Sequence, residues 1–135
     1  MFGALDTSTS ALVANRIRME TVAANIANAN SITDENGQNN PFRRRVALLA
    51  AGDPAGGSDR GVHVQEIVLD QAPFQLEHDP THPLADPVTG YIKKPNINPI
   101  FEQVNALEIS RAYEANIQAA EATKAMMQAA LRLLA

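Results

Sequence analysis

The chain has 135 residues, the length of one ordinary domain, and contains neither cysteine nor tryptophan. Its formal net charge is −4, and 19% of its residues are charged. The lack of cysteine excludes disulfide frameworks and cysteine-based metal or redox sites, and the mild negative charge gives no electrostatic basis for general nucleic-acid binding. No apolar run approaches the roughly 20 residues that cross a bilayer, and no basic leader precedes an apolar core. We therefore expect no transmembrane segment and no cleaved signal peptide.

Residues 1–30 are rich in small and apolar side chains and predict one helix. Asp6 or Ser8 is a candidate N-cap, and the helix is expected to stop after Asn30, where polar turn-forming residues gather. Asn15 lies within the predicted helical seam, where a buried polar side chain can fix register. The apolar row of this seam, spaced seven residues apart, consists of Leu5, Leu12, Met19 and Ile26.

Residues 31–97 carry nearly all of the glycines and prolines and predict short strands joined by turns. The segment 50–61 is expected to be a flexible connection or the end of a hairpin. The segments 79–90 and 93–99 contain too many prolines for regular structure. The three candidate strands are residues 42–49, 62–69 and 74–77.

Residues 98–135 predict a second, longer helix. Asn98 is a good N-cap, Pro99 suits the first helical position, and Glu102 lies in the first turn. Tyr113 widens an apolar stripe that recurs at intervals of three and four residues, while the opposite face is polar. The stripe consists of Ile109, Ala112, Asn116, Ala119, Thr123, Met126, Ala130 and Leu133, and the polar face holds Glu108, Arg111, Gln118, Glu121, Gln128 and Arg132.

The predicted fold is α+β, with long N- and C-terminal helices that pair as a coiled coil and a small β-rich, proline-rich middle segment. About half of the residues in the helical stripes are small, so they bury little area in a single molecule. We expect the helices to be completed by packing against other chains and to be loose in an isolated subunit. An ordinary helical hairpin buried under its own small sheet remains the alternative.

Few residues form a pattern that indicates chemistry. His78 and His82 are four residues apart, a metal-binding spacing on a helix, but Pro80 and Pro83 argue against a helix there. No nucleophile, phosphate-binding or metalloprotease motif is present, so we expect no enzyme, no metal and no cofactor. The basic run at residues 43–45 is split between two faces of a strand, which favours solvation or salt bridges to acidic neighbours over nucleic-acid binding.

Two terminal motifs resemble those of a known family. The segment 18–31 is similar to the N-terminal signature of the bacterial flagellar rod and hook proteins, with Ala24 in place of that pattern's first Asn. Residues 110–116 resemble the family's C-terminal motif. The family motif residues are Asn25, Ile26, Ala27 and Asn28 near the first helix end, and Arg111, Tyr113, Glu114, Ala115 and Asn116 in the second helix.

The middle segment is similar to the short proximal rod proteins of this family. The similarity lies in residues 41–44, 73–86 and 90–99, whereas residues 51–60 match no motif of the family. Within the family, two short proximal rod proteins are the candidates, and the segments 82–86 and 95–99 favour one of them. Outside the family, a cytosolic helical adaptor is the alternative.

The resemblance implies a structural subunit of the flagellar basal-body rod. It would assemble with related rod subunits and with copies of itself into a torque-transmitting helical tube for motility. Residues 1–30 and 98–135 would form the inner assembly layer, and residues 31–97 would lie outside it. The subunit would be exported by the flagellar type III apparatus without cleavage and would reside in the periplasm-spanning rod of the basal body, with no catalytic role.

Overall fold

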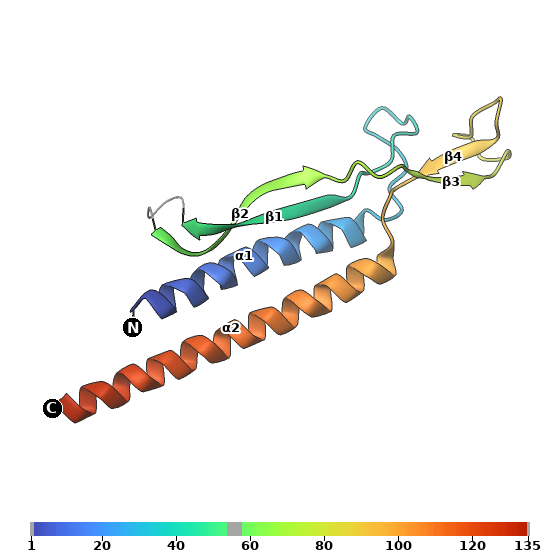
Figure 1. Cartoon of the computed structure of the whole chain (residues 1–135). Coiled ribbons are helices and arrows are strands. Elements are labelled where there is room, and N and C mark those ends of the chain that lie inside the picture. The colour runs from blue at the N-terminus through green and yellow to red at the C-terminus, as the bar shows by residue number, and fades with distance from the viewer. Residues whose placement is uncertain (1, 54–57, 135) are drawn as a thin grey trace.

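The computed structural model describes residues 2–53 and 58–134. The elements form a long β-hairpin, a helix beneath it and a second helix beyond that, so α1 lies between the β1–β2 hairpin and α2 (Figure 1). A second, short hairpin forms a tip at one end of the molecule (Figure 1). In chain order the elements are α1 Phe2–Ala27, β1 Arg45–Asp53, β2 Ser58–Leu69, β3 Gln75–His78, β4 Tyr91–Lys94 and α2 Pro99–Leu134. The predicted α+β class is confirmed.

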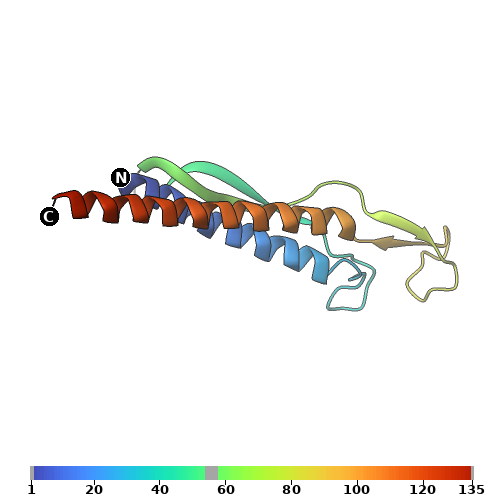
Figure 2. The ribbon, with the colours of Figure 1, turned by 90° about the horizontal axis from the view of Figure 1, so that it is seen from below.

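The two helices run antiparallel and differ in length. At about 1.5 Å per residue, the 26 residues of α1 span about 39 Å and the 36 residues of α2 span about 54 Å. Asn25 near the end of α1 hydrogen-bonds Glu102 in the first turn of α2, so the helices are aligned at the tip end. The C-terminal part of α2 therefore extends past the start of α1 (Figures 1 and 2).

The start of α2 was predicted correctly, and the start of α1 was not. Asn98 Oδ1 accepts the N–H of Ile100 at 3.0 Å, and α2 begins at Pro99. By contrast, α1 already begins at Phe2, so Asp6 and Ser8 lie inside the helix and cap nothing. The residues before Asp6 include alanine and leucine, which are good helix formers and extend the helix upstream. At its other end α1 stops at Ala27, and a turn continues to Asn30.

The long hairpin agrees with the predicted pair of strands, with shifted bounds. β1 and β2 are antiparallel, Arg45 opposite Leu69 and Asp53 opposite Ser58, with irregularities after Leu48 and Ala51. Residues 50–53 and 58–61 are the ends of these two strands, which agrees with a hairpin end and not with a flexible connection; residues 54–57 lie outside the described residues. α1 meets the far end of the hairpin closely, since Val62 N–H donates to Ser10 Oγ at 3.1 Å.

The short tip hairpin contains a strand that the sequence did not predict. β4 pairs antiparallel with β3 and includes Lys93 and Lys94, although residues 93–99 were expected to be irregular. The prolines at 87 and 95 flank this strand instead of interrupting it, so the backbone N–H groups of β4 remain available for pairing. His78 belongs to β3, and the helical geometry that would join it to His82 is absent.

The buried core is small for a chain of this length. Ala14, Val22 and Ile109 are buried in the helical part, and Ile92 and Ile97 are buried near the base of the tip. Large apolar side chains on both helices and on the long hairpin remain exposed. A single copy of the chain thus leaves much of its apolar surface uncovered.

Candidate assembly surface

Asn25, from the N-terminal family motif, ties α1 to the start of β1. Its Nδ2 donates to the carbonyl of Arg45 at 2.8 Å, and its Oδ1 accepts the Arg45 N–H at 2.9 Å. The same Nδ2 also donates to Glu102 Oε2 at 3.0 Å. Asn25 is only 1% exposed, so one buried side chain of α1 hydrogen-bonds both β1 and α2.

Glu102 and Arg44 form the charged part of this buried junction. Arg44 Nε donates to Glu102 Oε1 at 2.7 Å, Arg44 Nη1 donates to Asp70 Oδ2 at 3.3 Å, and Glu102 is 1% exposed. Burial acts to lower the pKa of Arg44, but its hydrogen bonds and charge interactions with Glu102 and Asp70 outweigh burial and raise it. The salt-bridging interpretation of the basic run is therefore correct for Arg44.

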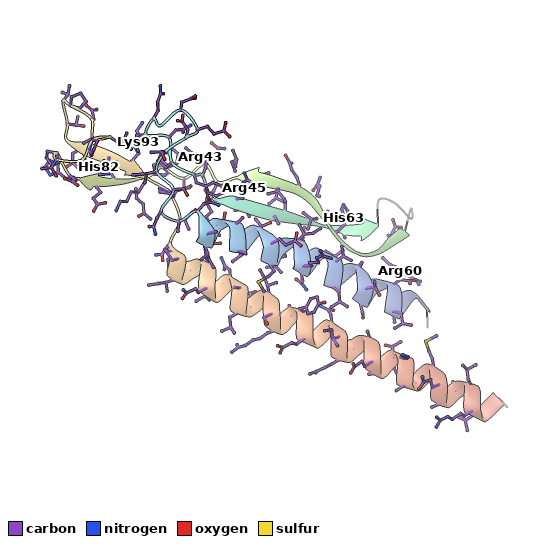
Figure 3. All side chains as sticks on the ribbon, turned by 180° about the vertical axis from the view of Figure 1, so that it is seen from behind. Arg43, Arg45, Arg60, His63, His82 and Lys93 are labelled. Carbon is purple, nitrogen blue, oxygen red and sulfur yellow. The ribbon has the colours of Figure 1, made fainter. Side chains whose placement is uncertain are left out.

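Asn96 and Arg43 join the junction to the tip. Asn96 Oδ1 accepts the Arg44 N–H at 2.9 Å, and its Nδ2 donates to the carbonyls of Asp70 and Ala72. Arg43 donates to the same two carbonyls and lies 4.2 Å from the centroid of the Phe74 ring. Figure 3 labels Arg43 and Arg45 where the long hairpin approaches the tip. We call Asn25, Arg44, Asp70, Asn96 and Glu102 the polar junction.

Replacement of Asn25 by alanine tests the first contact of the polar junction. The substitution leaves the Arg45 N–H and carbonyl and one Glu102 oxygen without their partner in a buried site. We expect Asn25→Ala to lower the free energy of unfolding by about 1–3 kcal/mol, measured by urea denaturation. Asn30→Ala, at an exposed position in the following turn, is the control. Equal stability of the two variants would show that the Asn25 contacts are not stabilising.

Asp70 gives the polar junction a pH dependence. The Ala72 N–H donates to Asp70 Oδ1 and lowers the pKa of Asp70 below 3.8; burial opposes this shift, and Arg44 adds to it. Because the folded pKa is the lower one, the stabilisation is complete above the ordinary pKa and is lost as pH falls through the folded value. In urea denaturation we expect Asp70→Asn to be less stable than the parent near neutral pH. The difference should shrink below about pH 4; a difference that stays constant down to pH 2 would contradict this role.

The residues predicted for the assembly seam, from the apolar row of α1 and the stripe of α2, separate into three groups. Met19, Ile109 and Tyr113 lie together along an apolar groove between the helices, and Ile109 is 3% exposed. Leu5, Leu12 and Asn116 are half-buried. The exposed members of the seam are Ile26, Ala119, Met126 and Leu133, with Met126 60% and Leu133 88% exposed.

The exposure of the α2 members of the seam follows from helix geometry. In a straight α-helix a seven-residue repeat drifts by about 20° per heptad, so a row that starts toward α1 turns away from it along α2. The row 112, 119, 126 and 133 shows this change, from half-buried Ala112 to fully open Leu133. In addition, the last turns of α2 extend beyond α1. Both effects leave Met126 and Leu133 without a covering surface in one molecule, whereas Thr123, on the adjacent row of α2, is 8% exposed.

A longer row of α2, which shares Ala119, Met126 and Leu133 with the seam, is exposed throughout its length. Phe101, Val104, Met126 and Leu133 are its large apolar members, and the positions between them are mostly alanine. Small residues allow another helix to approach closely, and the large ones supply buried area. The alanines of this row are Ala115, Ala119, Ala122 and Ala129. The predicted polar face, from Glu108 to Arg132, is exposed as expected.

The two family motifs have different surroundings. In the N-terminal motif, Asn25 belongs to the polar junction and Asn28 Nδ2 donates to the Ala24 carbonyl at 2.8 Å, while Ile26 and Ala27 are exposed. In the C-terminal motif, Arg111, Glu114 and Ala115 are exposed, and Tyr113 lines the groove beside α1. Asn116 is half-buried and donates to the Ala112 carbonyl within its own helix. The sequence placed Glu102 in the first turn of the second helix but did not predict its contacts or those of Asn96. For Glu102 the acid in the first turn was the available signal; Asn96 had none.

Comparison with known proteins decides the family. The model of the family "Flagella basal body rod protein" matches residues 5–34, and that of "Flagellar basal body rod FlgEFG protein C-terminal" matches residues 88–133. The flagellar basal-body rod protein FlgC of Bacillus subtilis is 38% identical over 146 residues, covering 98% of this chain and 97% of the relative. The chain belongs to the FlgC family of basal-body rod proteins.

Other FlgC proteins show the same full-length similarity. FlgC of Escherichia coli O6:H1 is 38% identical over 128 residues, covering 95% of this chain and 93% of the relative. FlgC of Aquifex aeolicus is 40% identical over 132 residues, with 95% and 92% covered. The resemblance found in the sequence is confirmed, and the second short proximal rod protein, FlgB, is not favoured.

The described residues contain neither a metal-binding cluster nor a membrane-spanning helix. In residues 2–53 and 58–134, no group of three or more histidine, aspartate or glutamate side chains is arranged to hold a metal ion. No helix among the described residues is both long and apolar enough to span a membrane.

Proposed function

We propose that this chain is a structural subunit of the flagellar basal-body rod, assembling with copies of itself and with related rod subunits into a helical tube that transmits torque. The observation that carries the proposal is the 38% identity to FlgC rod proteins over nearly the whole chain. The exposed apolar row of α2 supports it, together with Val13 and Ile26 on α1, because these are surfaces that a neighbouring subunit would cover.

The terminal helices are the surfaces through which the subunits would associate. Each large apolar side chain that becomes buried contributes about 1.5–3 kcal/mol, and the intervening alanines permit close helix–helix contact. Supercoiling of the helices around one another would correct the drift of the seven-residue row and turn Met126 and Leu133 toward a partner. Residues 1–30 and 98–135 would thus form an inner coiled-coil layer, with residues 31–97 outside it.

The same proposal accounts for the remaining expectations. Heterologous contacts that do not close build a filament, and such a filament needs stiffness from its subunits rather than catalysis. We also propose that the flagellar type III apparatus exports the subunit without cleavage. The subunit would then reside in the rod, which crosses the periplasm.

Purification of basal bodies tests the proposal directly. Cells that lack the gene for this chain should be non-motile, and a tagged copy should restore motility and co-purify with basal bodies in an extraction-resistant form. Recovery of the tagged chain only in the cytosolic fraction of motile cells would favour the helical adaptor and contradict the rod subunit.

A further inference from the structure

The connection between α1 and β1 contains a tight turn organised by Asp34. Its Oδ1 accepts the N–H groups of Asn36 and Gln38, each at 2.9 Å, and its carbonyl accepts the Gly37 N–H at 3.0 Å. Thr33 and Asn39 pair across the base of this turn. Asn36 and Gly37 therefore project at the apex of a short, well-defined loop.

Asn36 and Gly37 form the single Asn-Gly dipeptide of the sequence. Both residues are exposed, and Gly37 has a φ of 74° with no atom within 4 Å of the place where a Cβ would stand. The Gly37 nitrogen therefore carries no neighbouring side chain that would hinder its approach to the Asn36 side chain.

We propose that Asn36 is a site of spontaneous covalent modification. The backbone nitrogen of Gly37 attacks Cγ of Asn36, the new N–Cγ bond closes a succinimide, and the Cγ–Nδ2 bond breaks. The Nδ2 group leaves as ammonia and takes up the proton from the Gly37 nitrogen. Water then opens the ring and yields either aspartate or isoaspartate at position 36; no oxidant, metal or enzyme is needed.

The structural effect of isoaspartate would extend beyond the turn, because Asn39 links the turn to β4. Asn39 Nδ2 donates to the carbonyls of Ile32 and Lys93, both at 3.0 Å, and its Oδ1 accepts the Lys93 N–H at 3.0 Å. These bonds cover the outer edge of β4 in the tip; Lys93 is labelled in Figure 3. Isoaspartate inserts an extra methylene into the main chain three residues before Asn39, which shifts Asn39 away from Lys93, whereas ordinary aspartate leaves the chain length unchanged.

The first test measures where the modification occurs. The full chain is incubated in mildly alkaline buffer, digested and analysed by mass spectrometry for replacement of an amide by an acid. Asn30, exposed and followed by Ser31, is the internal comparator. We expect Asn36 to convert roughly tenfold faster than Asn30, because Gly37 lacks a Cβ beside the attacking nitrogen. Equal rates, or no conversion at Asn36, would overturn the proposal.

A variant tests whether the turn controls the reaction. The bond from the Gly37 N–H to the Asp34 carbonyl must open before the ring can close, and the Asp34 carboxylate holds the turn together. Asp34→Ala should therefore accelerate conversion of Asn36 severalfold, and Asn36→Gln should abolish it. An Asp34→Ala rate equal to or slower than that of the parent would show that the structure does not restrain the site.

Amide exchange at Lys93 tests the consequence for the tip. The isoaspartate form, separated by chromatography, should lose protection of the Lys93 N–H to the level of Asn39→Ala. Asn36→Asp, which has the same charge without the extra methylene, should keep the protection of the unmodified chain. Full protection of Lys93 in the isoaspartate form would contradict the proposed link to β4.

Discussion

Met126→Asp is expected to block rod assembly and abolish motility while leaving the isolated subunit folded. Met126 is 60% exposed in the single chain, so the free energy of unfolding should change by no more than about 0.5 kcal/mol. In the proposed tube the same position is covered by a neighbouring helix, where an unpaired carboxylate costs several kcal/mol at every subunit. Motility on soft agar and recovery of basal bodies measure the effect, and circular dichroism checks the fold.

Gln128→Asp is the matched control for this experiment. It introduces the same charge two residues away, on the exposed polar face of α2. We expect Gln128→Asp cells to swim normally, and Ile26→Asp on α1 to behave like Met126→Asp. Normal motility of the Met126→Asp strain would count against burial of this surface in the rod.

Glu102→Ala is expected to cause the largest loss of stability in the isolated chain. The substitution leaves Arg44 with Asp70 alone and removes the second acceptor of Asn25 in a buried site. Loss of one partner from a buried ion pair typically costs 3–5 kcal/mol, and the partial exposure of Arg44 places our expectation at about 3 kcal/mol. Urea denaturation, with the free energy extrapolated to water, gives this value.

Glu108→Ala is the control for this experiment. It distinguishes the stability lost with the polar junction from any general effect of removing an acidic side chain from α2. Glu108 lies on the same helix and is exposed, so its loss should change stability by no more than about 0.5 kcal/mol. Glu102→Gln keeps the shape of the side chain without its charge and should fall between the two. Similar stabilities for Glu102→Ala and Glu108→Ala would mean that the polar junction does not hold the layers together.

Local signals predicted the helices and the long hairpin well. Asn98 and Pro99 fixed the start of α2 because capping depends on neighbouring residues alone. β4 was missed because its stability depends on pairing with β3 and on Asn39, which is more than 50 residues away in sequence. Local pattern rules do not detect such long-range pairing.

The candidate assembly surface was predicted only in part, because its contacts also depend on residues far apart in sequence and on the course of the whole helix. The seven-residue rows identified the apolar surfaces, yet the row alone did not reveal that a straight α2 would turn Met126 and Leu133 away from α1. The polar junction joins Asn25 to Glu102 across 77 positions of sequence, and each residue alone has an ordinary local role. The resemblance pointed to Asn25 as a motif residue without indicating its contacts.

Cryo-electron microscopy of basal bodies purified with this chain tests the central claim most directly. The account predicts that the chain occupies the rod and that helices of adjacent subunits cover Met126 and Leu133 on α2. A rod that lacks the chain, or one in which these two side chains face open solvent while the subunits touch only through residues 31–97, would contradict it.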